Sequence, residues 1–237
     1  MGLEMLRLFQ LVSPALPVGA FSYSEGLEVL VQAGRLAGAP AVQAWLEAEL
    51  RRGLVAVEAA ALPALMEALA RGDGDAAGDH DGWLLAQREA AELRAQQRQM
   101  GRSLLQLLAD LGWPPPAALS LAWTGAWAWA GVCLELPPLA VLEAYLHGWT
   151  ANQLSAAVRL VPLGPTEAQR LQLALAPLIA ERAAALQVVT QEPAVISTGG
   201  DGWEWRSGSG SGSWSGGVGA GLAQLRHAEL YSRLFRS

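Results

Sequence analysis

Residues able to do chemistry are few in this sequence, and they are scattered. Cys133 is the one cysteine, and because lysine is absent all 16 basic residues are arginines. Glu47 and Glu49 lie two positions apart on one predicted helix, which places them on different faces. The three histidines also stand far apart, at His80, His147 and His227. These spacings fit no zinc finger, no grouping of Ser, His and acid, and no pair of catalytic carboxylates. We therefore expect neither a catalytic residue nor a metal site in this chain.

An acidic stretch, residues 71–82, resembles part of a calcium-binding loop. Asp73, Asp75 and Gly78 fall on positions 1, 3 and 6 of such a loop. Position 12, where the loop needs a bidentate glutamate, is Leu84. We expect a solvated acidic linker here rather than a calcium site.

Composition narrows the class of protein. A chain of 237 residues with 52% hydrophobic and 16% charged residues suffices for one large domain with a packed core. Without lysine it cannot be a standard P-loop nucleotide hydrolase or a Schiff-base enzyme. A formal net charge of −6 argues against binding to nucleic acid. The single cysteine and an N-terminus without a signal-peptide pattern favour the cytoplasm.

Residues 117–134 carry no charge and include three tryptophans, which raises the question of a membrane span. Their length only just reaches the roughly 20 apolar residues that a bilayer requires. The segment is rich in Ala and Gly, and Glu135 follows it directly. We expect a buried core helix here, and a small helical membrane protein anchored by this segment is the alternative.

The whole pattern predicts an all-α, bundle-like single domain of about seven or more helices. Strand signals are nearly absent, and glycines and prolines separate the helical segments. A second capping box at Thr166 and Gln169 is expected to open the last of them. The first two predicted helices cover residues 3–11 and 23–33, and Gly34 ends the second. A long helix begins at Pro40, continues through Val57, and is kinked or divided at Pro63 before it ends at Gly72. The later helices cover about 82–111, the Trp-rich segment, about 139–160, and 166 to about 186.

Residues 13–28 join a helix end, a rigid loop and a helix start. Pro17 fixes φ and disfavours helix before it, while Gly19 allows a turn that a side chain would obstruct. Ser22 and Glu25 have the spacing of a capping box, in which each side chain bonds the backbone amide of the other residue. On these grounds alone the segment is a capping loop that shapes the core.

The C-terminal part differs in composition from the rest. Residues 187–220 are rich in Gly and Ser, so we expect a flexible linker. Beyond it, arginines alternate with Tyr231, Leu234 and Phe235, a mixture that is typical of protein interfaces and that can become ordered on binding. The tail could instead fold back on its own core. The predicted organisation is a helical domain at 1–186, a linker at 187–220 and a partner-binding tail at 221–237.

Four stretches resemble the urease accessory protein UreF family: residues 13–28, Asn152-Gln153, residues 157–164 and the last dozen residues. The resemblance covers residues 5 to about 186 and 221–237, in the family's order and spacing, and fails between them. It implies an all-helical chaperone that helps deliver nickel into urease and that forms a homodimer.

The resemblance also implies roles for particular residues. It places the loop after the first helix on the surface that meets the partner GTPase, together with the basic residue near position 159. The implied GTPase-side residues are Pro17, Gly19, Phe21, Ser24, Glu28 and Arg159. The tail is implied to become ordered on meeting UreD, called UreH in some systems. The implied residues on that side are Arg226, His227, Tyr231, Arg233, Leu234 and Arg236. Without the resemblance, Arg159 is a basic residue that favours the negative end of its helix.

These inferences predict a non-catalytic scaffold that bridges UreD and the GTPase UreG on apo-urease and modulates GTP-dependent nickel delivery. The partner complex, rather than cofactor sites of this chain, would handle nickel and GTP. Neither nucleic acid nor a membrane is an expected partner. The resemblance leaves open whether the protein is a GTPase activator, a checkpoint or a nickel conduit. A helical enzyme with an unrecognised pocket is a further alternative, for which perturbed carboxylates in a cleft would be the sign.

Overall fold

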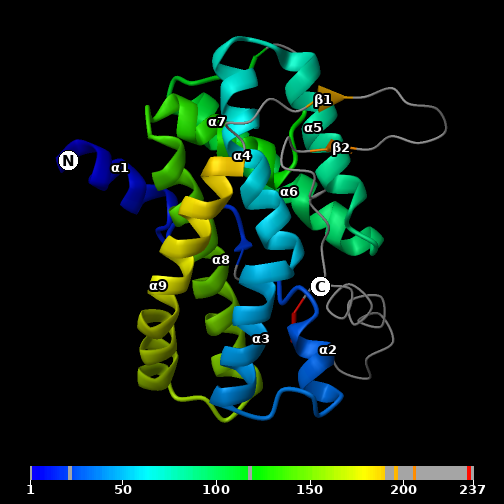
Figure 1. Cartoon of the computed structure of the whole chain (residues 1–237), viewed down its shortest axis with the longest axis vertical. Helices are drawn as coiled ribbons and strands as arrows, with labels where there is room; N and C mark the ends of the chain where they lie inside the picture. Colours follow the sequence, from blue (N-terminus) through cyan, green and yellow to red (C-terminus); the bar gives the residue numbers. More distant parts are fainter. Residues whose placement is uncertain are drawn as a thin grey trace.

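The computed structural model describes residues 2–20, 23–116, 119–189, 195–196, 205–206 and 234–235. These residues confirm the predicted all-α fold (Figure 1). The helices are α1 Gly2–Leu11, α2 Leu27–Gln32, α3 Ala39–Arg52, α4 Leu54–Ala70, α5 Gly74–Ala86, α6 Ala91–Asp110, α7 Trp123–Cys133, α8 Pro138–Leu160 and α9 Pro165–Val189. Two short strands, β1 Val195–Ile196 and β2 Trp205–Arg206, pair antiparallel, with Val195 opposite Arg206.

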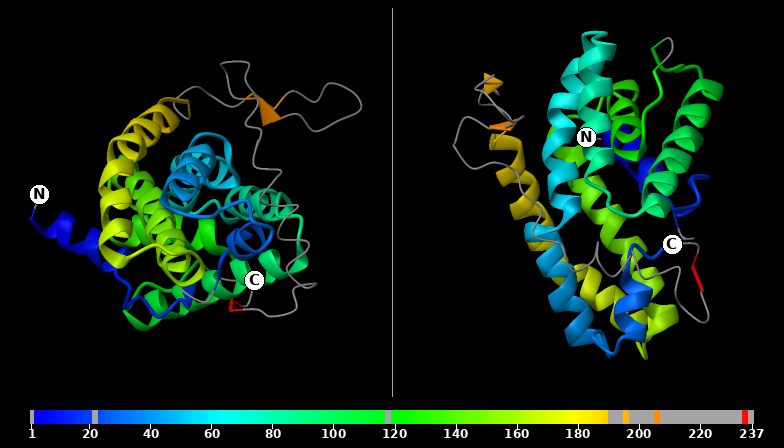
Figure 2. Two further views of the ribbon diagram at one scale, coloured as in Figure 1. Left: turned by 90° about the horizontal axis from the view of Figure 1, so that it is seen from below. Right: turned by 90° about the vertical axis from the view of Figure 1, so that its right-hand side faces the viewer.

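Helix α4 lies at the centre of the fold. It packs against α3, α5, α7, α8 and α9, and nearly every side chain from Val55 to Leu69 on its inner surfaces is buried. A helix that is apolar on most of its circumference must be surrounded by other elements. The long helices α8 and α9 run side by side along one flank, while α5, α6 and α7 cover the other (Figures 1 and 2).

Several helix boundaries follow from the signals in the sequence. Pro40 occupies the first turn of α3, where its missing amide hydrogen costs nothing. Gly34 has a φ of 68° just after α2, and the amide of Arg35 bonds back to the carbonyl of Leu30, which closes the helix end. Both predictions are confirmed.

The expected acidic linker at residues 71–82 is wrong, because most of it is helix α5. Asp73 caps this helix by accepting a hydrogen bond from the amide of Ala76 at 3.1 Å. Asp81 is buried and accepts from the amides of Ala122 and Gly125 at 2.7 and 2.9 Å. Its carboxylate therefore caps the first turn of α7 from another helix, a role that requires burial rather than solvation.

Two expected helices are divided differently from the prediction. The segment expected at about 82–111 is interrupted between α5 and α6, at residues 87–90. The chain from Pro40 to Gly72 divides at Gly53 rather than at Pro63, which lies inside α4. Gly53 adopts an extended ψ of 173°, and a Cβ there would lie 2.0 Å from the carboxylate of Glu49.

Neither expected capping box opens a helix where it was predicted, and Ser22 lies outside the described residues. Helix α2 begins at Leu27, after Gly26 with a φ of 90°, and no side chain caps it. Glu25 has a φ of 48° and its carboxylate bonds other elements instead. Helix α9 begins at Pro165, so Thr166 lies inside its first turn instead of preceding it.

Within the apolar segment at 117–134, residues 123–133 form α7, a buried helix of the core as expected. Helix α7 has only 11 residues, about half the length that a bilayer requires, and most of its side chains are buried. The described residues contain one stretch, Ala39–Ala70, that is long and apolar enough to cross a membrane by composition alone, and 67% of its most apolar window is buried inside the structure. Such burial is that of a core helix.

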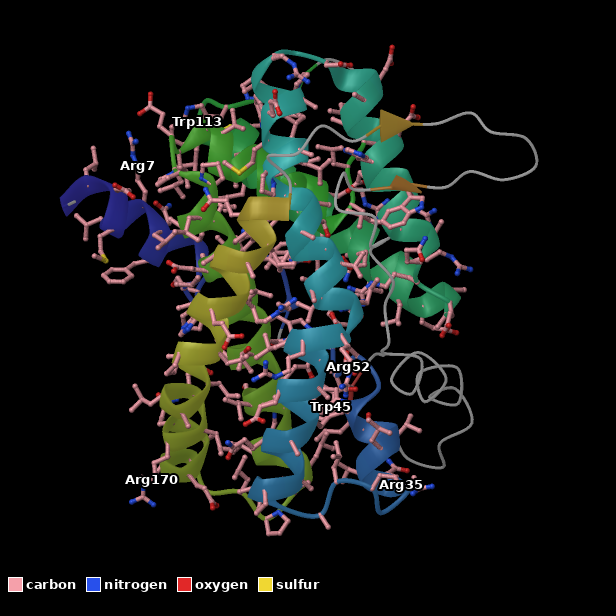
Figure 3. All side chains as sticks on the ribbon, in the orientation of Figure 1. Arg7, Arg35, Trp45, Arg52, Trp113 and Arg170 are labelled. Carbon is pink, nitrogen blue, oxygen red and sulfur yellow. The ribbon has the colours of Figure 1, made fainter. Side chains whose placement is uncertain are left out.

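Helix α1 stands away from the body (Figures 1 and 2). Arg7, labelled in Figure 3, ties it to the segment after α7: the guanidinium donates to the carbonyl of Leu134 and to the carboxylate of Glu135, both at 2.9 Å. Leu8 and Leu11 pack against the core, and four other large apolar side chains of α1 remain more than 45% exposed: Leu3, Met5, Leu6 and Phe9.

The close approach of α6 and α7 provides a test of the fold. A Cβ at Gly101 would lie 2.5 Å from the carbonyl oxygen of Leu121, whereas a Cβ at Gly148 in α8 would meet nothing within 4 Å. We expect Gly101→Ala to lower the free energy of unfolding by about 1–3 kcal/mol because of overpacking. Gly148→Ala should raise it by about 0.5–1 kcal/mol. Urea denaturation measures both, and equal effects of the two substitutions would contradict this packing.

Candidate functional site

The loop before α2 places its residues in different environments. Pro17 is exposed, and Gly19 has a φ of 74°, the left-handed conformation that favours glycine. Ser24 and Glu28 are buried, with exposed fractions of 0% and 2%. Phe21 lies outside the described residues. The buried pair therefore faces the interior, while Pro17 faces solvent.

The carboxylate of Glu28 binds the end of the chain. It accepts hydrogen bonds from the backbone amides of Leu234 at 2.6 Å and Phe235 at 3.2 Å. The guanidinium carbon of Arg159 lies 4.6 Å from the ring centroid of Phe235, which is a cation–π distance. Figure 1 shows this C-terminal segment, in red, beside α2. We call Glu28, Arg159, Leu234 and Phe235 the C-terminal contact.

The C-terminal contact joins residues that sequence reasoning had assigned to separate surfaces. Glu28 and Arg159 were expected on the GTPase side, and Leu234 on the UreD side. Phe235, only 5% exposed, was not among the expected site residues, although its position between two arginines is the signal that could have found it. The other expected tail residues lie outside the described residues: Arg226, His227, Tyr231, Arg233 and Arg236.

A cavity of about 310 Å³ lies between the N-terminal loop and helices α6, α7 and α8. Its size falls at the lower end of the range of about 300–1,000 Å³ that is usual for ligand pockets. Most of its lining is apolar or aromatic, and its polar groups include Glu25, Gln96 and Tyr145. The complete lining is Leu11, Val12, Ser13, Pro14, Leu16, Val18, Ala20, Glu25, Gln96, Met100, Trp123, Trp127, Tyr145, Gly148, Trp149, Ala151, Asn152 and Ser155.

Three side chains hold Glu25 in the cavity wall. One carboxylate oxygen accepts from the side-chain amide of Gln96 at 3.1 Å. The other accepts from the indole N–H of Trp149 at 3.1 Å and from the guanidinium of Arg88 at 3.5 Å. Trp149 in turn packs against Trp45 of α3, with ring centroids 5.9 Å apart; Figure 3 labels Trp45 and Arg52 on the part of α3 beside α2.

Behind this wall, Arg88 and Glu58 form a buried ion pair. The Nε of Arg88 donates to Oε1 of Glu58 at 3.0 Å, and a second guanidinium nitrogen bonds the same oxygen. Tyr145 donates to the other carboxylate oxygen at 2.9 Å. Burial raises the pKa of Glu58, and the charge of Arg88 opposes that shift. For Arg88, burial lowers the pKa, but the attraction of Glu58 and Glu25 outweighs it, so the pKa is raised.

Glu49 adds a third acid to this region. Burial and, to a smaller extent, the negative charge of Glu25 raise the pKa of Glu49 from 4.5 to about 7, against the opposing charges of Arg88 and Arg52. Neither Glu49 nor Glu58 lines the cavity. The perturbed carboxylates that would indicate an enzyme are therefore present, but they lie behind the cavity wall rather than in the cleft.

Within the described ranges, no group of three or more His, Cys, Asp or Glu side chains is arranged to hold a metal ion. His80 is half-buried, and burial lowers the pKa of His80. The side chain of His147 is exposed, its pKa is lowered by partial desolvation, and one ring nitrogen lies 3.1 Å from the side-chain amide of Gln172. The thiol of Cys133 has a pKa raised to about 11 by burial, which disfavours the thiolate that a metal requires.

Comparison with known proteins gives a consistent result. Residues 36–176 match the family model described as UreF. Proteins named urease accessory protein UreF from Thermosynechococcus vestitus and Alkalilimnicola ehrlichii are 38% and 40% identical to this chain. The alignments span 98% and 100% of this chain and 97% of each relative. They therefore also run across residues 187–220, where the resemblance was expected to fail.

The C-terminal contact can be tested by hydrogen exchange. We expect Glu28→Gln to speed exchange of the amides of Leu234 and Phe235 by about tenfold or more, because hydrogen bonds to a charged group contribute about 1.5–3 kcal/mol. Glu47→Gln, which alters a carboxylate bonded to Gln43, is the matched control. NMR or mass spectrometry measures the rates. Unchanged exchange in Glu28→Gln would show that the carboxylate does not hold these amides.

The buried acid Glu49 predicts a pH dependence of stability. Its pKa is raised from 4.5 to about 7, so between these pH values the folded state keeps a proton that the unfolded state releases. Its contribution to the free energy of unfolding therefore falls as pH rises through that window, by up to about 3 kcal/mol.

The amide that Glu49→Gln introduces does not titrate, so this variant does not share the loss of stability that wild type shows as pH rises. The free energy of unfolding of the variant, measured relative to wild type, should therefore increase from the lower to the upper end of that pH window. Denaturant titrations at both ends measure the difference. Glu67→Gln, at an exposed carboxylate on α4, controls for the loss of one charge. A constant difference between Glu49→Gln and wild type across the window would contradict the raised pKa.

Proposed function

Since this chain belongs to the UreF family of urease accessory proteins, we propose that it bridges UreD and the GTPase UreG on apo-urease. In this role it modulates GTP-dependent delivery of nickel during urease maturation. Nickel is the cargo of the assembly, and GTP is bound and hydrolysed by the partner GTPase. The chain itself acts in the cytoplasm as a non-catalytic scaffold.

The C-terminal contact is the observation that carries this proposal. It brings together Glu28 from the N-terminal motif, Arg159 from the end of α8 and the chain end itself. A partner that binds the tail would therefore change the surroundings of Glu28 and Arg159 directly. Two surfaces that recognise different partners can be coupled when they share one set of side chains.

The chemistry of the contact suits exchange between two states. Arg159 is exposed in the last turn of α8 and stacks on Phe235, so a partner carboxylate can compete for its guanidinium. Among the described residues, Leu234 and Phe235 contact the core through two backbone amides and one aromatic ring. A partner that binds the protein more tightly when the tail is released, or when it is docked, shifts the equilibrium between these two states. The size of the shift is set by the difference between its affinities for the two states.

A homodimer is part of the same proposal. Helix α1 leaves Leu3, Leu6 and Phe9 between 57% and 64% exposed, and this apolar surface stands clear of the body (Figure 1). Exposed apolar patches of this kind mark protein contacts. A second copy of the chain offers the same helix in return, as a two-fold interface requires.

Co-expression with the matching UreD and UreG tests the proposal. The mass of the species that elutes together from a sizing column, with GTP and magnesium, should correspond to a complex that contains two copies of this chain. Deletion of residues 226–237 should leave a helical protein that no longer enters the complex. Arg159→Ala should weaken complex formation about tenfold or more, since truncating a central interface arginine typically costs about 2 kcal/mol or more.

Arg98→Ala is the matched control, because Arg98 is exposed on α6. Circular dichroism confirms that each variant keeps its helical content. If the deletion and Arg159→Ala enter the complex as wild type does, the C-terminal contact has no part in assembly, and the scaffold role proposed from it is wrong.

A further inference from the structure

The cavity combines a negative charge with aromatic walls. Glu25 is the only charged residue among the described side chains that line it, and the side chain of Glu25 is 14% exposed. Four aromatic residues share the lining: Trp123, Trp127, Tyr145 and Trp149. Trp127 lies between Trp123 and Tyr145, at centroid distances of 5.2 and 5.6 Å, so the rings form one continuous wall.

The charge of Glu25 is poorly neutralised. Arg88, the only cation that pairs with it in the described part of the chain, is 3.5 Å away and is bound much more closely by Glu58. Glu49 lies near enough for its pKa to respond to the charge of Glu25. Glu58 thus takes up most of the charge of this buried guanidinium, and the negative charge that faces the cavity is that of Glu25.

The backbone at Glu25 is held in an unfavourable conformation. Its φ of 48° is left-handed, a conformation that is unfavourable for a residue with a Cβ. The bonds from Gln96 and Trp149 fix the carboxylate in this position. Strain of this kind persists where surrounding contacts impose it, and it frequently marks a functional site.

We propose that this cavity binds a guanidinium group, presented by an arginine side chain of a partner protein. A planar guanidinium stacks on aromatic faces and pairs with a carboxylate, and both features meet here on one wall. Asn152 and Ser155 on the same lining offer side-chain oxygens to its remaining N–H donors.

The position of the cavity argues for a protein as the source of the arginine. Pro14 and Ser155 of the lining are exposed, so they mark the side that opens to solvent. Arg159 lies one turn further along α8 and donates to the carbonyl of Ser155 at 3.3 Å. The exposed lining residue Ser155 is therefore bonded to Arg159 of the C-terminal contact, and this assignment of the source rests on the proposed function.

A titration with small probes tests the guanidinium site without any partner. The probe is N-acetylarginine methylamide, and the matched control is N-acetylcitrulline methylamide, which has nearly the same shape but no charge. We expect the arginine probe to shift the indole N–H signals of Trp123, Trp127 and Trp149 in NMR spectra, with a dissociation constant on the order of 1 mM. The citrulline probe should bind about tenfold more weakly or not at all.

Variants decide whether Glu25 is responsible. Glu25→Gln should weaken binding of the arginine probe about tenfold, while Glu92→Gln, at an exposed carboxylate on α6, should bind as wild type does. Retention of the other backbone signals shows that Glu25→Gln is folded. No binding of the arginine probe to either wild type or the chain lacking residues 226–237, equal binding of both probes, or unchanged binding to Glu25→Gln each overturns the guanidinium site.

The source of the arginine is decided in the complex. We expect Glu25→Gln to weaken binding to UreD and UreG about tenfold, with Glu92→Gln unchanged. If the arginine probe binds only after deletion of residues 226–237, the chain's own tail is the occupant, and a partner source is wrong. If Glu25→Gln forms the complex as well as wild type does, an arginine of the partner is likewise excluded as the occupant of the cavity. If wild type forms no complex, the proposed function fails, and the probe titration still decides on the cavity.

Discussion

The structure depends on one buried ion pair at its centre. Glu58 stands in the second turn of α4, the helix that packs against α3, α5, α7, α8 and α9, and Arg88 reaches it from the break between α5 and α6. Removing one partner of such a pair typically costs about 3–5 kcal/mol, because the other charge stays buried and unpaired. The position of the break after α5 is therefore tied to the position of α4. Tyr145 extends the same constraint to α8.

Polar groups at helix ends supply the remaining order. Asp81 accepts two amide hydrogens at the start of α7, and Glu28 accepts two from the chain end. In both cases a carboxylate satisfies backbone donors of a segment distant in sequence. These bonds are directional, and the hydrophobic effect that fills the core is not. These directional hydrogen bonds therefore set which face of each apolar helix points outward. With the helices oriented in this way, Glu25 lies at the wall of the cavity.

The proposed roles of the C-terminal contact and of the cavity are connected through α8. Arg159 at its end stacks on Phe235, Ser155 one turn earlier lines the cavity, and Trp149 nearer its middle bonds Glu25. A rigid helix that carries groups from both places can transmit a change at one to the other. The family to which the chain belongs concerns assembly of other proteins, and such a shared helix suits that task.

The sequence by itself determined three things. Local periodicity predicted the all-α class and the position of α8, and the turn residue Gly34 predicted the end of α2. The ordered motifs predicted membership in the UreF family. Tertiary structure alone decided that the acidic segment at 71–82 is helical and that Glu25 leaves its expected capping role. It also decided that Glu28 and Arg159 meet Phe235. The physical reason is that a carboxylate takes whichever donors the fold brings within about 3 Å, and those donors lie many residues away in the chain.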